Sequence, residues 1–537
     1  MGEDGGQKFI ETVPKRGYRF VTEVREAEIT PSETENSTEN SRNAVKPGKK
    51  LWAAGFGALL AAAVGLGFWW FLSRPANDRQ IDSIEVLPFA NETGSAESEY
   101  LSDGVTESLI NSLARLPELE VKARSSVFRY KDKDVSPQQI GRELSVEAVL
   151  TGRLVRRGEQ LTISLELIDA ATGNQLWGEQ YNRRSNDLVS LESEIAADVA
   201  KKLRVKLSGS DRQQAARKHT ENSEAYALYL QGRFVLNQNT EESIEKSIPF
   251  FDRAIALDPR YAPAYAARAE AHYASAEWTV SNNEAIPKAK ADLATALSLD
   301  DTLVEALTLS ALIKYQYDWD FAASAAEFKK ALALNPNYAD AHRQYGWYLS
   351  QIGRTDEGLV EMKLALQLDP FSPQASIDAA APLIKSRQYD AAVEHLRRSI
   401  DLHPNYFLGH FALGWTLVHK NEYAAAIEAF ERAKELNYAP FIDGGLGYAY
   451  AKSGQQEKAR QILRELQERA KQREIPPYWM AMIYHGLGEK EETYDWLEKA
   501  LAGRSFWLLW LKTEPLLDEI RSEPRFQNLL RKVNFPS

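Results

Sequence analysis

The side chains best suited to acid–base or metal chemistry are few, and their spacing argues against a catalytic centre. His403, His410 and His419 are separated by intervals of 7 and 9, whereas a zinc-binding H-x-x-x-H pair places two imidazoles on one helix turn. The chain has no cysteine, which excludes thiolate nucleophiles, thiolate zinc sites and iron–sulfur clusters. We therefore expect no metal site and no cofactor.

Three carboxylates, Asp103, Glu107 and Glu143, are the obvious candidates for general acid or base work. Asp103 stands in a Ser-Asp-Gly string ahead of a predicted helix, where capping of the helix is the simpler interpretation. Neither G-x-x-x-x-G-K nor G-x-G-x-x-G occurs, so the sequence predicts no phosphate-binding loop. We therefore expect that the protein is not an enzyme and that its function is to bind a partner.

Side chains that bind a partner must be positioned by regular elements. Residues 222–503 contain such elements, because their sequence repeats with a period of 34 residues. The positions that recur at this interval are Pro336, Pro370 and Pro404, with Tyr438 at the next place, and the small residues Ala331, Ala365, Ser399 and Ala433. Such a period indicates tetratricopeptide repeats, in which each helix pair buries its apolar face against its neighbours. Residues 504–537 are expected to form a C-terminal helical cap.

The first helix of each repeat lines the concave face of such an array. Aligning the repeats places eight aromatic or cationic side chains there, which we call the predicted groove residues: Arg343, Trp347, Lys385, Phe411, Trp415, His419, Tyr448 and Lys452. They predict a groove that binds a protein or peptide partner carrying apolar and acidic residues. For the aromatic members, the alternative is a place in the core between repeats.

Residues 81–207 have the pattern of a small α/β domain. The order of predicted elements is β-α-β-α-β-β-β-α, which implies helices layered on a sheet. The predicted elements are a strand at 83–90, a helix at 98–116, an alternating strand at 119–130, a helix start at Ser136 and Pro137, a hairpin across Gly158, a further strand, and a closing helix at 187–205. On the helix at 98–116 one face is apolar, formed by Leu101, Val105, Leu109, Ile110 and Leu113.

Residues 51–72 form an uncharged stretch of 22 residues without proline. As a helix it would measure about 33 Å, enough to cross a hydrocarbon core of about 30 Å, so it predicts one transmembrane helix. A buried globular helix and a cleaved signal peptide fit less well, because the stretch is long and follows 50 mostly polar residues. Basic residues gather before the stretch, which predicts a bacterial inner-membrane protein with a cytoplasmic N-terminus and a periplasmic C-terminal part.

Two segments precede this stretch. Residues 26–50 are rich in Ser, Thr, Glu and Asn and predict a disordered cytoplasmic linker. Before them, FIETVPKRGYRFVTEV (9–24) predicts two short strands around a basic turn. It resembles the C-terminal hairpin of the OmpR/PhoB-type winged-helix domain, whose pattern is I-x-T-V-x-x-x-G-Y-R-F. The resemblance implies that Lys15, Arg16 and Arg19 lie on the wing beside a DNA backbone. The DNA-reading helix would lie upstream, so residues 1–25 are expected to be a truncated winged-helix domain.

The order of these segments resembles the CadC-like family of membrane-spanning regulators. Within it, the string VLPF…YLSDGVTESLINSLAR…GRELSVEAVLTGRL…LIDAATGNQLWGEQY is similar to the TolB-N-terminal-like or FlgO-like domain. The expected fold class is multidomain: a truncated winged-helix hairpin, one transmembrane helix, a small α/β domain and an all-α tetratricopeptide-repeat superhelix.

Two functions follow from these expectations. The resemblance implies a membrane-anchored, signal-transducing transcriptional regulator, with a homodimer as a plausible route for the signal. The alternative is an envelope scaffold that uses its repeats for protein–protein interaction and has lost DNA binding. The net charge of −11 gives no general attraction to DNA, so DNA is an expected partner only through an upstream winged-helix region.

Overall fold

The computed structural model describes residues 10–13, 17–20, 81–93, 98–184, 187–203, 219–276, 280–471 and 475–536. The chain divides into two compact units, Met1–Asp78 and Arg79–Ser537. In the first unit, β1 (Ile10–Val13) and β2 (Gly17–Phe20) pair antiparallel, which confirms the predicted hairpin. Arg19 lies in β2 opposite Glu11, whereas Lys15 and Arg16 lie outside the described residues.

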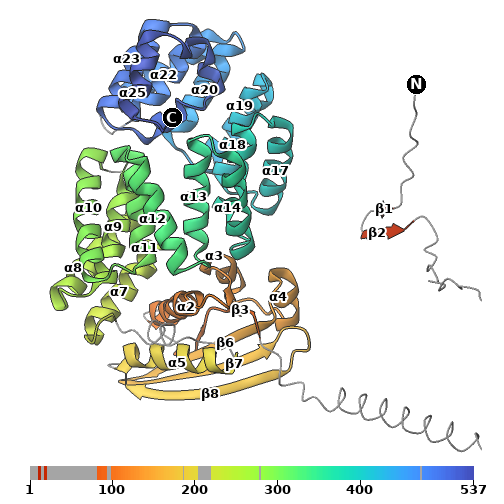
Figure 1. The fold of residues 1–537 in the computed structure, drawn as a ribbon, viewed down its shortest axis with the longest axis vertical. Coiled ribbons are helices and arrows are strands. Elements are labelled where there is room, and N and C mark those ends of the chain that lie inside the picture. Colours follow the sequence, from red (N-terminus) through yellow and green to blue (C-terminus); the bar gives the residue numbers. More distant parts are fainter. Residues whose placement is uncertain are drawn as a thin grey trace, which may run out of the picture. The chain divides into compact units, whose positions relative to one another are not determined.

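The second unit begins with a mixed sheet of order β5-β3-β6-β7-β8 (Figure 1). Its strands are β3 (Ser83–Val86), β5 (Glu120–Val121), β6 (Ala148–Arg157), β7 (Gln160–Asp169) and β8 (Gln175–Arg184). β3 is parallel to both β5 and β6, while β6, β7 and β8 form an antiparallel meander. The short β4 (Ala90–Asn91) also pairs with β6.

Helices cover both faces of this sheet. α2 (Glu99–Ala114) and α5 (Leu188–Lys202) bury their apolar faces with one side of the sheet in a single core, and α4 (Pro137–Leu144) packs on the other side. The hydroxyl of Ser136 accepts from the Gln139 amide and caps α4, and Gly158 turns the β6–β7 hairpin at φ +61°. These features confirm the predicted helix faces, the helix start and the hairpin.

The predicted strand at 119–130 is wrong beyond its first residues. After β5 the chain forms α3 (Arg124–Val127) and the 3₁₀ turn η3 (Phe128–Tyr130). The reason is a distant contact: the Ser126 hydroxyl donates to Asp369 Oδ1 at 2.6 Å and accepts from the Phe371 amide at 3.0 Å. Local alternation of apolar residues carries no information about such a partner. The capping interpretation of Asp103 is also wrong, because Ser98 is the N-cap of α2.

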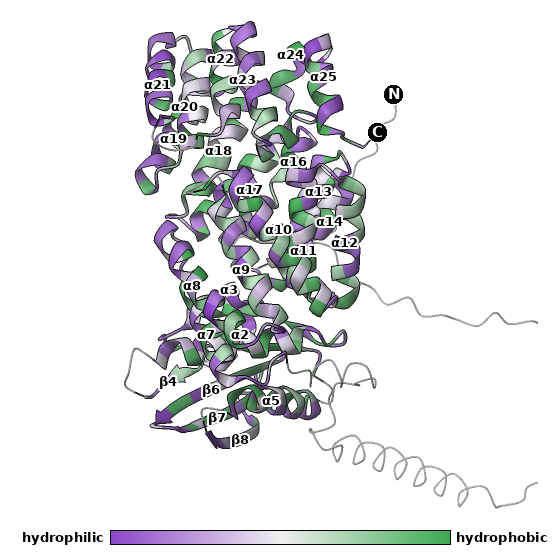
Figure 2. Ribbon diagram, turned by 90° about the vertical axis from the view of Figure 1, so that its left-hand side faces the viewer, coloured by the Kyte–Doolittle hydropathy of each residue, from purple (hydrophilic) through white to green (hydrophobic). Residues whose placement is uncertain are grey.

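The repeat region is an array of antiparallel helix pairs. The described residues form eight pairs: α7 (Ser223–Leu236) with α8 (Glu241–Leu257), α9 (Ala262–Ser275) with α10 (Asn282–Leu299), α11 (Val304–Ile313) with α12 (Phe321–Leu334), α13 (Ala339–Gln351) with α14 (Thr355–Leu368), α15 (Pro373–Asp378) and α16 (Ala381–Lys385) with α17 (Tyr389–Leu402), α18 (Phe407–His419) with α19 (Tyr423–Leu436), α20 (Pro440–Lys452) with α21 (Gln456–Arg469), and α22 (Pro477–Leu487) with α23 (Lys490–Ala502). Hydrophobic and hydrophilic residues alternate along each helix, as expected where one face is buried (Figure 2). The small residues spaced by 34 are all buried, which confirms the repeats.

Two first helices of the array are irregular. α11 continues into a π-helical turn, η5 (Lys314–Asp318), which ends at Trp319 with φ +58°. In the fifth pair the first helix is interrupted between α15 and α16. Pro382 lacks the amide that would continue the helical hydrogen bonds, which accounts for the break. Both irregularities lie beside the cavity described below.

After the last pair, the C-terminal segment folds back along the array. It contains η6 (Phe506–Trp510), η7 (Pro515–Leu517), α24 (Asp518–Arg521) and α25 (Pro524–Val533). α25 packs on α23, but the residues before it reach the middle repeats. Arg504 Nη1 donates to the Tyr317 carbonyl at 2.7 Å, and Arg387 Nη2 donates to Asp518 Oδ2 at 2.6 Å. The segment therefore does more than close the end of the array.

The predicted fold class needs correction. It included a transmembrane helix, whereas no helix among the described residues is long and apolar enough to cross a membrane. The described fold is a small mixed-sheet domain followed by an all-helical repeat superhelix. The predicted linker at 26–50 and the predicted span at 51–72 lie outside the described residues.

Candidate binding site in the repeat array

A cavity of about 380 Å³ lies between the first helices of the middle repeats and the C-terminal segment. Helices α13, α15, α16 and α18 provide one side, and η6 provides the other. Six of the eight predicted groove residues line this cavity: Arg343, Trp347, Lys385, Phe411, Trp415 and His419. Tyr448 is fully buried in the adjoining core and Lys452 is exposed elsewhere, so neither belongs to the site.

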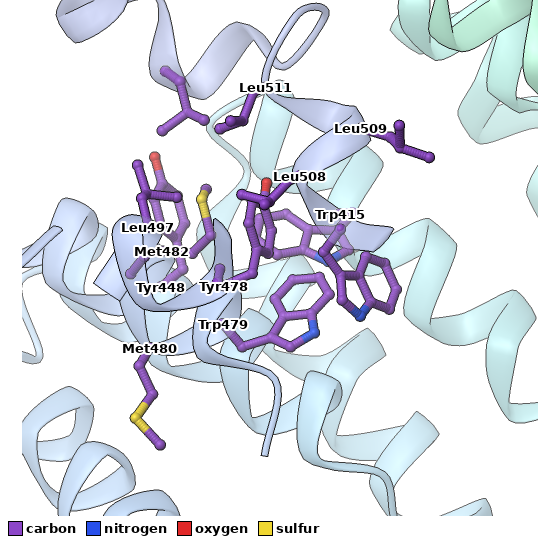
Figure 3. Packing of buried hydrophobic residues seen from close by; sticks show 14 of the residues in the cluster. Trp415, Tyr448, Tyr478, Trp479, Met480, Met482, Leu497, Leu508, Leu509 and Leu511 are labelled. Carbon is purple, nitrogen blue, oxygen red and sulfur yellow. The ribbon is translucent and has the colours of Figure 1, made fainter. Parts of the chain in front are cut away.

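Behind one wall of the cavity, Trp479 connects the lining residues Trp415 and Trp507 into a cluster of aromatic rings. The indoles of Trp415 and Trp479 stack with centroids 5.6 Å apart (Figure 3). Trp507 meets Trp479 edge to face, with centroids 4.5 Å apart. Trp415 is only 4% exposed and Phe411 only 7%. These two side chains line the cavity and also belong to the core between repeats, as the alternative interpretation of the aromatic residues held.

Arg343 is the first cation of the cavity, and its charge is already neutralised. It donates from Nε to Asp340 Oδ1 at 3.0 Å and from Nη1 to Asp378 Oδ2 at 2.7 Å. The Asp378 carboxylate also accepts a hydrogen bond from Trp347. Burial raises the pKa of Asp378, and Arg343 opposes that rise. This network rigidly joins α13 to α15.

Lys385, the second cation, has no such partner. Its Nζ lies 4.7 Å from the centroid of the Trp510 ring, and no acid of the described part of the chain forms an ion pair with it. Burial lowers the pKa of Lys385 to about 8, although the nearby Glu514 opposes this shift. The break before α16 sets this lysine at the cavity wall.

Glu514, the acid nearest Lys385, is held by other groups. Its Oε1 lies 3.2 Å from His419 Nε2, with both side chains 2% exposed, and accepts from the Leu516 amide at 3.1 Å. Burial lowers the pKa of His419 below its usual value, with Glu514 acting in the opposite direction, so the imidazole is neutral at pH 7. This buried contact places the C-terminal segment against α18.

The C-terminal residues of the site were missed by the sequence reasoning. Phe506, Trp507, Leu509, Trp510 and Glu514 all line the cavity. With its amide oriented as its surroundings require, Gln351 donates to the Leu509 carbonyl at 3.1 Å and accepts from Trp510 Nε1 at 3.3 Å. A signal was present: the run SFWLLWL is too apolar for a terminal cap, which needs a polar outer face.

The remaining candidates for chemistry do not come together. Asp103 pairs with Lys131 at 2.6 Å, and Glu143 accepts from the Tyr130 hydroxyl at 2.6 Å. His410 Nε2 lies 3.1 Å from the Pro404 carbonyl, apart from the His419 contact. Within the described ranges, no group of three or more potential metal ligands occurs.

Glu107, the third candidate acid, lies at the interface between the sheet domain and the repeats. Arg233 of α7 donates to its Oε1 from Nη2 at 2.8 Å, and Asn237 donates to its Oε2 at 2.8 Å. The pKa of Glu107 is lowered: burial acts to raise it, but the charges of Arg233 and Arg124 outweigh burial. Glu107 is thus a buried structural anion.

Asn337 makes a second set of contacts across this interface. Its Nδ2 donates to the carbonyls of Leu119 at 2.8 Å and Leu116 at 3.3 Å. Together with the Asp369–Ser126 bond and the Arg233–Glu107 pair, these contacts join three places in the repeat array to α2, to α3 and to the segment between them. A displacement of the repeats therefore acts directly on the sheet domain.

Comparison with known proteins gives the sheet domain a family. Residues 79–198 match the second domain of HilA/YgeH-like transcriptional regulators, and residues 327–359 and 380–440 match tetratricopeptide repeats. The chain thus contains a HilA/YgeH-like second domain and tetratricopeptide repeats.

Two curated relatives extend this match. The transcriptional regulator HilA of Salmonella typhimurium is 24% identical over 311 residues, which are 57% of this chain and 54% of HilA. The putative adenylate cyclase 3 of Rhizobium meliloti is 34% identical over 184 residues, which are 34% of this chain and 31% of that protein. The chain therefore spans about half or less of the relatives it matches. Among solved structures, MamA shares 24% identity with a TM-score of 0.25, over 30% of this chain and 96% of MamA.

Proposed function

We propose that this chain is the regulatory part of a bacterial transcriptional regulator, and that its repeats bind a protein or peptide partner. The HilA/YgeH-like second domain supports a regulatory role, and tetratricopeptide repeats generally mediate protein–protein interaction. The domain match favours this function over the envelope scaffold. We further propose that the chain is not itself an enzyme.

The observation that carries this proposal is the buried polar interface between the sheet domain and the repeats. A flexible tether would let each part act alone, whereas the Glu107–Arg233 pair joins α2 to α7, and Asn337, just before α13, binds the segment that follows α2. Breaking a buried charge pair costs about 3–5 kcal/mol, so the two parts move together or the interface is lost. Partner binding on the repeats is in this way transmitted to the regulator-type domain.

The test is made in the source bacterium. The gene is deleted, the strain is complemented with the wild-type chain or with the interface variant Glu107→Ala, and transcripts are sequenced. We expect a defined set of transcripts to change on deletion, to be restored by the wild-type chain, and to remain altered with Glu107→Ala although the variant protein accumulates. Identical transcripts in the deleted and parental strains would contradict a regulatory function.

A further inference from the structure

The cavity beside η6 has polar donors that the protein itself leaves unused. The indole Nε1 atoms of Trp415 and Trp507 are buried, and no acceptor among the described residues reaches either of them. Both side chains line the cavity together with Lys385, whose ammonium forms no ion pair within that same part of the chain. Buried polar groups are normally hydrogen-bonded, so two unpaired indole donors and an ammonium without an ion pair, all from side chains that line one cavity, point to a ligand that supplies acceptors.

The charges around the cavity define the ligand further. Arg343 is balanced by Asp340 and Asp378, whereas Glu514 accepts from the Leu516 amide, lies beside the neutral His419 and forms no ion pair with Lys385 among the described residues. Lys385 is therefore the wall cation that a ligand can still pair with. A carboxylate suits it, since charge-assisted hydrogen bonds are about twice as strong as neutral ones.

The rest of the wall is largely aromatic and apolar, and it also includes the side chains of four glutamines, Gln316, Gln344, Gln351 and Gln374. Trp347, Trp415, Phe441, Trp507 and Trp510 all border the cavity, and a volume of about 380 Å³ falls in the range of small-molecule sites. Offset or edge-to-face contacts with an aromatic ligand ring are favourable against such a wall.

We propose that this cavity is an effector site for a small aryl carboxylate. The carboxylate lies against Lys385 and the indole N–H groups of Trp415 and Trp507, and the aromatic ring lies among the surrounding indoles. This inference rests on the proposed function, in which the repeats pass a signal to the HilA/YgeH-like domain. Because η6 and α18 share the cavity, a bound ligand fastens the C-terminal segment to the middle repeats.

The test measures binding to the purified full chain by isothermal titration calorimetry. The probes are phenylacetate, 3-phenylpropionate, 4-hydroxyphenylacetate and indole-3-acetate, with 3-phenylpropionamide as the neutral analogue. We expect saturable binding of at least one acid at one site per chain and a loss of at least about tenfold in affinity for the amide. Lys385→Met should lower the affinity for the acid to a similar extent. Trp415→Phe or Trp507→Phe should lower this affinity severalfold, because each removes the indole N–H and keeps an aromatic side chain.

Lys452→Met is the matched control, since this predicted groove lysine lies outside the cavity and should leave binding unchanged. If circular dichroism shows that Lys385→Met does not fold, the affinities of the two tryptophan variants test the proposal instead. The inference is overturned if no acid binds, if the amide binds as well as the acid, or if only a peptide ending in phenylalanine binds. Each of these results leaves the transcript experiment unaffected, so failure of the effector site is distinguishable from failure of the regulatory function.

Discussion

At the residue scale, burial determines how the ionisable groups of the cavity behave. His419 is held neutral because its ring is almost fully enclosed, and Lys385 has a lowered pKa for the same reason. Both side chains were predicted from the sequence to lie on one face of the array, and both line the cavity. Sequence reasoning did not identify Glu514 as the partner of His419, because the two residues are 95 positions apart and no local pattern connects them.

The first prediction concerns the pH dependence contributed by His419. In the unfolded chain its pKa is about 6.5, whereas burial keeps it lower in the folded chain. As the pH falls below about 6.5, the unfolded state takes up a proton that the folded state does not, so the free energy of unfolding decreases. In urea titrations, the His419→Gln variant should therefore lose less unfolding free energy between pH 7 and pH 5 than the wild-type chain. His410→Gln is the control, and an equal effect of both variants would contradict the assignment.

At the element scale, the helix pairs depend on close approaches between small and large residues. A Cβ added at Gly414 of α18 would lie 2.6 Å from Phe430 Cε1, and the Phe430 ring of α19 is fully buried. The recurrence of small residues every 34 positions predicted this packing, because each of these residues lies where two helices of the array approach closely. The helix at 124–127 and the return of η6 to the middle repeats were not predictable in this way, since both depend on partners outside their own segment.

The second prediction tests this packing with Gly414→Ala. Alanine favours the helix by about 1 kcal/mol, but overpacking a rigid core costs about 1–3 kcal/mol. We therefore expect a lower free energy of unfolding, measured with urea, and a lower melting temperature. Gly503→Ala is the matched control, because its added Cβ would meet its nearest neighbour at 3.6 Å. A stabilised Gly414→Ala variant would show that α18 and α19 are not packed this closely.

At the scale of the whole molecule, the sheet domain and the repeats are one mechanical unit. Residues 79–198 carry the match to regulator second domains, and the first and middle repeats hold that domain through Glu107, Asn337 and Asp369. The sequence indicated both parts and their order. The sequence did not indicate that the two parts share an interface, because the polar residues of that interface form no recognisable motif and are far apart in the chain.

The most direct test of this coupling is hydrogen exchange, resolved by peptide, during urea unfolding of the full chain. We predict that α2 and α7 lose protection at the same urea concentration in the wild-type chain. Asn337→Ala leaves the buried Leu119 carbonyl without its donor, a cost of about 1–3 kcal/mol, and should lower the urea midpoint at which α2 loses protection. Asn405→Ala, the same repeat position two repeats later and exposed, should leave it unchanged. Separate midpoints for α2 and α7 in the wild-type chain, or an unchanged α2 in Asn337→Ala, would contradict the account.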